Sequence, residues 1–221
     1  MCRQDQFGID AEIMIDHAWG LEPCGMAEIK AYKPSTNSLS EGQVLAEPYP
    51  YDKARIIVAE MADSLVFQLT DKNLVTDGLT LDVGYDRENC DKGSYRGPVH
   101  IDHYGRSVPK GAHGSTHLGN PTNLGSRIVT AAVELFDRIA NRSLTVRRIT
   151  MAANRVVQDE GVYQFDLFSD VKKQEKEKNL QKALLGIKKK YGKNAILKGT
   201  NFLDGATMRE RNKQIGGHKE S

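Results

Sequence analysis

Residues 51–85, YDKARIIVAEMADSLVFQLTDKNLVTDGLTLDVGY, carry a helical pattern that changes into a strand pattern. From Tyr51 to Lys72 apolar side chains recur every three or four positions, which predicts a helix with one apolar face. From Leu79 to Tyr85 they recur at every second position, which predicts a strand with one buried side. Both elements need a partner for that side, so the stretch indicates helices packed on a sheet.

The flanking sequence adds three strands and a second amphipathic helix. The predicted strands are Gln43 to Glu47, Ala112 to Leu118 and Leu144 to Val157, and the helix is Ser126 to Asn141. A Gly-rich stretch from Asp86 to Gly111 predicts a long hairpin. The sequence therefore predicts an α+β fold in the order β-α-β-β-α-β, a four-stranded sheet with two helices on one face.

The last strand changes phase at Arg147 and Arg148. Leu144 and Val146 share one phase, whereas the apolar residues from Ile149 onward share the other. An inserted residue at the arginine pair, a β-bulge, reconciles the two phases and turns the pair outward. The side of the sheet away from the helices is then polar, with these expected members: Thr80, Asp82, Gly84, Thr116, Thr150 and Asn154.

Both ends of the chain lie outside this pattern. Phe7 to Gly20 predicts a short helix, and residues 34–42 predict a linker that leads into the first strand. After the sheet domain, Lys172 to Tyr191 has apolar residues at helical spacing among lysines and glutamates. Ala195 to Ser221 is polar and Gly-containing, so a flexible basic tail is expected.

The composition fits a protein of a reducing cytosol. No apolar stretch is long enough for a membrane span, and no apolar segment of a secretion signal follows Met1. The three cysteines are scattered, which argues against a disulfide framework.

Charge is divided along the chain. Residues 1–91 hold 7 basic and 17 acidic side chains, residues 92–156 hold 10 and 3, and residues 172–221 hold 14 and 5. Such asymmetry favours contact between a polyanion and the later part of the chain. The alternative is solvated charge without a specific partner.

A short motif, Gln164-Phe165-Asp166-Leu167-Phe168, follows the last strand. It fits the Gln-x-Asp/Ser-Leu-Phe pattern of peptides that bind the bacterial sliding clamp. Leu167 and Phe168 would enter an apolar pocket, worth about 3–6 kcal/mol before ordering costs, while Gln164 bonds at its rim. The alternative is an apolar segment that packs on its own domain.

Metal and nucleotide chemistry are not favoured by the motifs. The histidine pairs His100/His103 and His113/His117, with Cys90, invite a zinc hypothesis, but they lie in extended, Gly-rich segments where such pairs diverge. No phosphate-binding glycine loop is present. No metal site is therefore predicted, and no catalytic residue.

Cationic side chains around the arginine pair are candidates for phosphate contacts. Arg106, Lys110 and His113 lie on the predicted hairpin beside Arg147 and Arg148. Such contacts give affinity and register without reading a base sequence.

Several strings resemble the C-terminal part of bacterial Y-family (translesion) DNA polymerases of the UmuC and DinB types. The resemblance spans nearly the whole chain and rests on these strings: FGIDAE at 7–12, IDHAWG at 15–20, KPSTNSLSEGQVL at 33–45, DHYGR at 102–106, AHG at 112–114, LFDRI at 135–139, VRRI at 146–149, KYGKNAI at 190–196 and QIGGHK at 214–219.

The resemblance implies a domain division. Residues 1–33 would be the end of the thumb, 34–42 a linker, 43–158 the little-finger domain, 159–171 the clamp-binding segment and 172–221 a helix and flexible tail. The catalytic palm, and the Mg²⁺ that belongs to it, would lie outside this chain, so we expect no cofactor here and no polymerase activity of the chain alone.

The resemblance implies that the chain holds primer–template or damaged DNA for error-prone, SOS-type synthesis and that the chain itself is tethered to the sliding clamp. It also implies a cytoplasmic, nucleoid-associated location in a bacterium. The predicted DNA contacts are Lys33, Ser38, Ser40, Arg106, Lys110, His113, Thr116, Arg147, Arg148 and Asn154; the predicted clamp contacts are Gln164, Asp166, Leu167 and Phe168. One alternative is a regulatory module that occupies the clamp without binding DNA. Another is an active polymerase whose palm is encoded upstream in frame.

Overall fold

The computed structural model describes residues 10–22, 24–32, 37–91, 95–161, 171–215 and 218–219. The chain divides into two compact units, Met1–Thr36 and Asn37–Ser221. The first unit contains two short helices, α2 (Asp10–Ala18) and α3 (Met26–Ala31). Helix α2 falls within the helix expected at Phe7 to Gly20.

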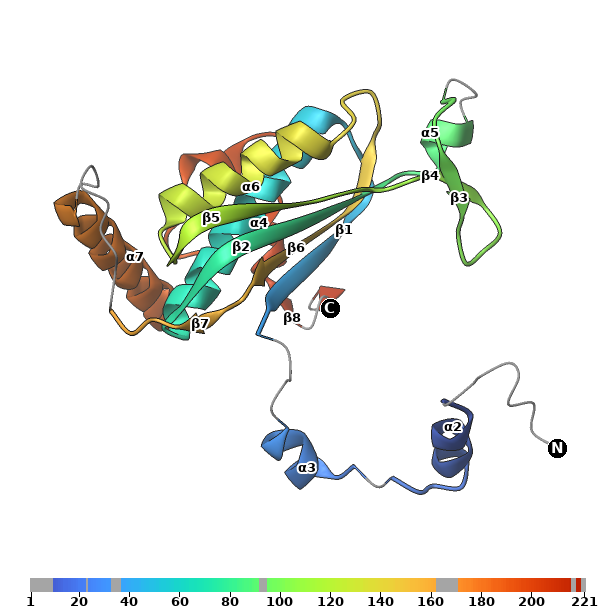
Figure 1. Ribbon diagram of the computed structural model, residues 1–221, viewed down its shortest axis with the longest axis horizontal. Coiled ribbons are helices and arrows are strands. Elements are labelled where there is room, and N and C mark those ends of the chain that lie inside the picture. Colours follow the sequence, from blue (N-terminus) through green and yellow to red (C-terminus); the bar gives the residue numbers. More distant parts are fainter. Residues whose placement is uncertain are drawn as a thin grey trace. The chain divides into compact units, whose positions relative to one another are not determined.

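The second unit is built on an antiparallel sheet with strand order β1-β6-β2-β5 (Figure 1). Along the chain its elements are β1 (Leu39–Tyr49), α4 (Tyr51–Asp71), β2 (Leu74–Tyr85), β5 (Ala112–Thr122), α6 (Gly125–Ile139) and β6 (Val146–Asn154). A short strand, β7 (Val157–Gln158), pairs with the start of β2. The predicted α+β fold is therefore confirmed, with one short strand more than expected.

Helices α4 and α6 lie on the same face of the sheet (Figure 1). The apolar stripe of α4 is buried, and the alternate residues Leu79, Leu81 and Val83 of β2 are each 1% exposed beneath it. Burial of each such side chain contributes about 1.5–3 kcal/mol. The period-two and helical patterns of residues 51–85 thus describe the two sides of one core.

The segment between β2 and β5 forms a projection from the end of the sheet. It contains a short helix, α5 (Glu88–Asp91), and a hairpin of β3 (Val99–Ile101) and β4 (Ser107–Pro109). Figure 1 shows this hairpin extending beyond the ends of the long strands. The expected hairpin is present, although its paired part is shorter than the sequence suggested.

The predicted bulge in the last strand is also present. Gly84 pairs with Arg148, but the next residue of β2, Tyr85, pairs with Val146, so Arg147 is the extra residue. The insertion brings Val146 and Ile149 onto the same buried side. The extra residue Arg147 therefore explains the change of apolar phase in the sequence.

The C-terminal extension (residues 171–215) packs on the helices, in contrast to the flexible tail that the sequence suggested. Its elements are α7 (Val171–Tyr191), the 3₁₀ helix η1 (Gly199–Phe202), α8 (Met208–Arg211) and the strand β8 (Gln214–Ile215), which pairs with β9 (His218–Lys219). Buried Glu60 of α4 accepts hydrogen bonds from the side chain of Asn201 and the backbone of Thr207. Polar residues there bond to the domain, so polarity alone misled the prediction.

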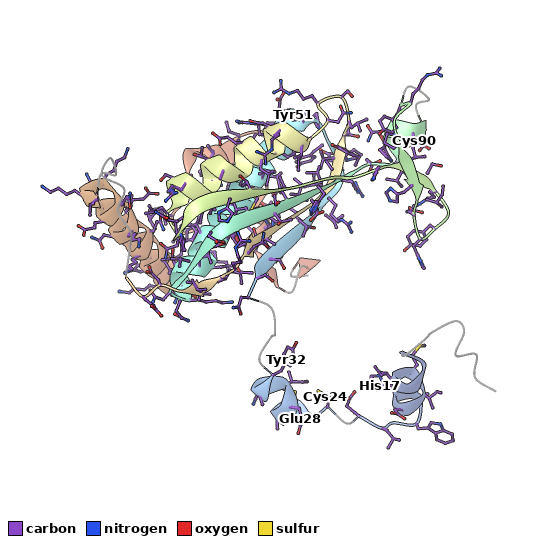
Figure 2. The ribbon with its side chains drawn as sticks, viewed as in Figure 1. His17, Cys24, Glu28, Tyr32, Tyr51 and Cys90 are labelled. Carbon is purple, nitrogen blue, oxygen red and sulfur yellow. The ribbon has the colours of Figure 1, made fainter. Side chains whose placement is uncertain are left out.

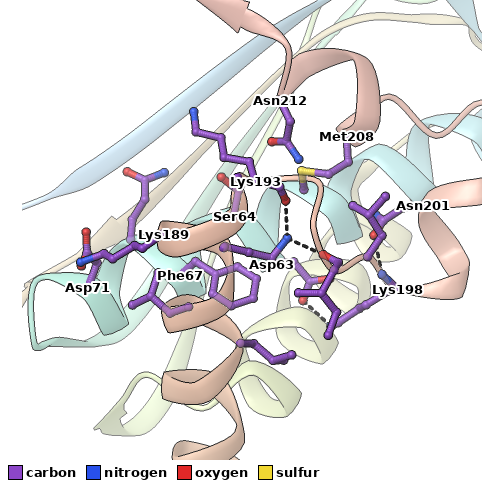
Figure 3. Close-up of a pocket in the computed structure, with 17 residues that line it drawn as sticks. Asp63, Ser64, Phe67, Asp71, Lys189, Lys193, Lys198, Asn201, Met208 and Asn212 are labelled. Atoms are coloured by element: carbon purple, nitrogen blue, oxygen red, sulfur yellow. Dashed lines mark hydrogen bonds and ion pairs between the residues drawn. The ribbon is translucent and has the colours of Figure 1, made fainter.

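A pocket of about 700 Å³ lies between α4, α7 and the part of the extension that follows α7 (Figure 3). Its floor is apolar, and the ammonium group of Lys188 enters it and donates to the carbonyl oxygens of Lys193 and Ile196 at 2.8 Å each. Burial lowers the pKa of Lys188. These bonds tie the turn after α7 back to the helix, so the pocket belongs to the packing of the extension.

Helix α7 also completes the start of α6. The residue that precedes α6, Leu124, has no side chain that can cap the helix. Gln181 accepts from the backbone N–H of Gly125 at 2.7 Å, and Glu177 accepts from that of Ser126 at 2.7 Å. The two α7 side chains therefore satisfy amide groups that the first turn leaves open.

No helix in the described ranges is long and apolar enough to cross a membrane.

Candidate nucleic-acid interface

Within the described residues of the second unit, no element covers the side of the sheet opposite the helices, and we call this side the open face (Figure 1). Strand register assigns its members, because directly paired residues of antiparallel strands point to the same side. They are Ser40, Gly42 and Val44 of β1; Arg148, Thr150, Ala152 and Asn154 of β6; Thr80, Asp82 and Gly84 of β2; and His113, Ser115 and His117 of β5. Most of these side chains are small or polar, with hydroxyl groups and the guanidinium of Arg148 among them, and such groups can contact a nucleic-acid backbone.

Thr116 does not belong to the open face, and its predicted place there is wrong. It pairs with the buried Leu79 and so points to the helix side. Helix α6 approaches β5 closely, since an added Cβ at Gly114 would lie 2.8 Å from a methyl group of Ile139. Small residues on β5 permit this approach, and they left the apolar phase of the strand too weak to assign from sequence.

A cleft of about 970 Å³ lies where the open face meets the projecting hairpin. It brings together Arg106 of the hairpin, His113 of β5, and Arg147 and Arg148 of β6. These residues are separated by up to 42 positions in the sequence, yet they line one hollow. The structure thus gathers four of the cationic candidates.

The two arginines of the bulge differ in their surroundings. Arg148 is exposed and points along the open face opposite Gly84, where the missing side chain leaves it room. Arg147 donates to the carbonyl oxygen of Ala46 at 3.0 Å and lies 3.7 Å from the carboxylate of Asp86. Arg148 is therefore the more available of the pair, whereas the sequence suggested that both point outward.

Acidic side chains in the cleft are paired with bases. The imidazole of His113 lies 2.6 Å from the carboxylate of Asp82 across the β2–β5 ladder. On the hairpin, Arg106 binds Asp102 at 2.7 Å, and this bond, with backbone donors, lowers the pKa of Asp102 to about 2. The pairing limits the repulsion that these carboxylates would exert on a phosphate.

A second polar network at the far end of β2 and β6 was missed by the sequence analysis. Arg155 donates to the carboxylate of Asp77 at 2.6 Å and lies 3.1 Å from a ring nitrogen of His117. Arg155 has a positive φ of 48°, which turns the chain at the end of β6. The only sequence signal for Arg155 was its position directly after Asn154, which was a predicted DNA contact.

The other predicted contacts are placed as follows. Ser40 pairs with Ala152 on the open face, and Ser38 is exposed just before β1. The amide of Asn154 already donates to Thr80 at 2.7 Å. Lys110 is exposed beside the cleft but does not line it.

Five predicted site residues lie outside the described residues. They are Lys33 and the clamp-motif residues Gln164, Asp166, Leu167 and Phe168.

Within the described ranges, no group of three or more His, Cys, Asp or Glu side chains gathers in a way that could hold a metal ion. His113 and His117 lie instead beside the carboxylates of Asp82 and Asp77, at 2.6 and 3.8 Å.

A four-stranded antiparallel sheet with two helices on one face is the fold expected of a little-finger domain. Residues 36–167 match the impB/mucB/samB family C-terminal domain, and the chain belongs to this family. The resemblance to the C-terminal part of a bacterial Y-family polymerase is thereby confirmed.

Two curated relatives support this assignment. The chain is 23% identical over 216 residues to DNA polymerase IV 2 of Halalkalibacterium halodurans, which covers 96% of this chain and 46% of the relative. It is also 23% identical over 218 residues to the UvrX protein of Bacillus subtilis, provisionally named a UV-damage repair protein, with coverage of 98% and 46%. The chain thus spans about half the length of these relatives.

Proposed function

We propose that this chain holds primer–template DNA on the open face of its sheet, as the DNA-gripping part of a polymerase that acts in DNA-damage tolerance. The observation that carries the proposal is the cleft in which Arg106, His113, Arg147 and Arg148 meet on an uncovered sheet. The names of the relatives, a DNA polymerase and a UV-repair protein, agree with it.

The contacts would be to phosphates and independent of base sequence. The open face offers hydroxyl groups and the guanidinium of Arg148. Among the described residues, no Asn or Gln side chain, the type that reads adenine, lines the cleft. Backbone contacts of this kind fix the position of a duplex without selecting its sequence. A surface that must accept damaged DNA of any sequence needs this property.

Nucleotidyl transfer and its Mg²⁺ would belong to the part of the relatives that this chain does not cover. Phosphoryl transfer by two metals needs clustered carboxylates. The acidic groups of the cleft are instead engaged by Arg106, Arg147 and His113. The role proposed for the chain is therefore binding and positioning.

A second part of the proposal is a tether to the sliding clamp through Gln164–Phe168. Its support is the motif in the sequence and its place between β7 and α7. Capture of the chain on immobilised clamp should be lost in a variant with Leu167→Ala and Phe168→Ala. Leu180→Ala, at an exposed leucine of α7, is the matched control and should retain capture. Capture that survives the double substitution would remove the tether.

DNA binding is tested by fluorescence anisotropy of a labelled primer–template at two salt concentrations. If Arg106, Lys110, Arg147 and Arg148 each neutralise one phosphate, affinity should fall about 150-fold between roughly 50 and 200 mM salt. Binding that is absent at low salt, or indifferent to salt, would contradict the proposal. Clamp capture without DNA binding would favour the regulatory module instead.

A variant with Arg147→Ala and Arg148→Ala tests the cleft itself. It should bind DNA at least 10-fold more weakly at low salt and show a shallower salt dependence by about two phosphate contacts. The matched control, Lys176→Ala with Lys182→Ala, removes the same charge from exposed positions of α7 on the helix side. It should bind DNA within about 2-fold of the parent, because α7 lies at the opposite end of the sheet from the hairpin (Figure 1) and exposed charges far from a phosphate are screened by salt.

A further inference from the structure

The tip of the β3–β4 hairpin presents an exposed aromatic ring. Tyr104 is 76% exposed, and two apolar residues of the same hairpin, Val99 and Ile101, are 50% and 63% exposed. Large side chains gathered on a projecting element mark a contact site more often than a solvated surface. None of the cationic contacts proposed above accounts for them.

The tip is held in one conformation by the carboxylate of Asp102. One of its oxygens accepts from the backbone N–H groups of Tyr104 and Arg106, each at 2.9 Å, and the other accepts from the Arg106 side chain at 2.8 Å. Gly105 adopts a φ of +74° that allows the chain to close the turn. The ring is therefore carried on a fixed support, and ordering it on binding costs little.

The surroundings of the ring favour a nucleobase as its ligand. The guanidinium group of Arg106 lies 4.7 Å from the centroid of the Tyr104 ring, and the ring of His103 meets it edge-on at 5.4 Å. Tyr104 and Arg106 both line the basic cleft that also contains Arg147 and Arg148. An aromatic surface that adjoins a phosphate-binding groove is the arrangement by which proteins hold unpaired bases.

We propose that Tyr104 is a stacking platform for an unpaired base of the DNA that occupies the cleft. The inference rests on the proposed function, since the cleft must bind the backbone from which that base comes. Arg106, which lies over the Tyr104 ring and binds Asp102, would hold the ring in place as well as contact a phosphate. A fully paired duplex has no base available for this contact, so the site distinguishes DNA with a single-stranded element from a blunt duplex.

The test uses two labelled DNAs with the same paired region, one blunt and one with a short single-stranded overhang that carries 2-aminopurine. The parent chain should prefer the overhang DNA and quench the 2-aminopurine fluorescence by stacking. Tyr104→Ala should weaken binding of the overhang DNA about 10-fold. It should also abolish the quenching and leave blunt-duplex affinity within about 2-fold of the parent.

Two controls separate stacking from folding. Tyr104→Phe keeps the ring and should restore both affinity and quenching, whereas Ser107→Ala, at an exposed position of β4, should leave both unchanged. Unchanged quenching in Tyr104→Ala, or equal losses for both DNAs, would overturn the stacking site while leaving the proposed function intact. Failure of the parent to bind either DNA at low salt would overturn both.

Discussion

Replacement of Gln181 by alanine tests whether α7 is part of the folded domain. Gln181 is only 8% exposed; its carbonyl oxygen accepts from the N–H of Gly125 at 2.7 Å and its amide donates to the carbonyl oxygen of Asn123 at 2.9 Å. Removal of the side chain leaves both groups without these partners. A lost hydrogen bond costs about 1 kcal/mol, and more where the remaining group stays buried.

We therefore expect Gln181→Ala to lower the free energy of unfolding by about 2–3 kcal/mol. The assay is urea unfolding followed by far-UV circular dichroism, with Lys182→Ala as the control at an exposed neighbouring position. The control should change the free energy of unfolding by less than about 0.5 kcal/mol. If Gln181→Ala also stays within that limit, α7 does not cap α6 in solution and the packed extension is wrong.

Three further perturbations probe other parts of the domain. Gly114→Ala should destabilise it by about 1–3 kcal/mol in urea unfolding, because the new methyl group collides with α6, whereas Gly186→Ala on α7 meets no atom and should be neutral or slightly stabilising. The NMR shift of the Arg106 amide should hold from pH 7 to about 4 and change towards pH 2, because the lowered pKa of Asp102 keeps the tip bonded until that carboxylate is protonated. Burial raises the pKa of Glu41, so the contribution of this side chain to stability is present at low pH and is lost as the pH rises through its raised pKa. The urea midpoint of Glu41→Gln should therefore depend less on pH above 4 than the urea midpoint of the parent.

The sheet and its two helices could be predicted because their patterns are local. Period-two and helical spacing in residues 51–85 report directly which side of each element is buried, and the phase change at Arg147 reports the bulge. The face of β5 could not be assigned in this way. Its residues there are small because α6 packs against Gly114, and a close approach leaves no apolar period to read.

The candidate site was predicted in part. Arg106, His113, Arg147 and Arg148 were named from charge and meet in one cleft, but the pairing of His113 with Asp82 depends on a strand register that no local pattern reveals. Arg155 was missed for the same reason, because its partner Asp77 lies on another strand. The packed extension was missed because the buried carboxylate of α4 that accepts its hydrogen bonds is far away in the sequence.

The most direct test of the account is to find which face of the sheet lies against DNA. A DNA-cleaving iron chelate is attached to a cysteine placed at Ser115 on the open face or at Glu134 on the exposed side of α6, in a chain whose native cysteines are replaced by serine. If DNA lies on the open face, the chelate at Ser115→Cys should cleave the strands of a bound primer–template, and the chelate at Glu134→Cys should give no cleavage above background. Cleavage from the α6 position alone would contradict this placement of the DNA.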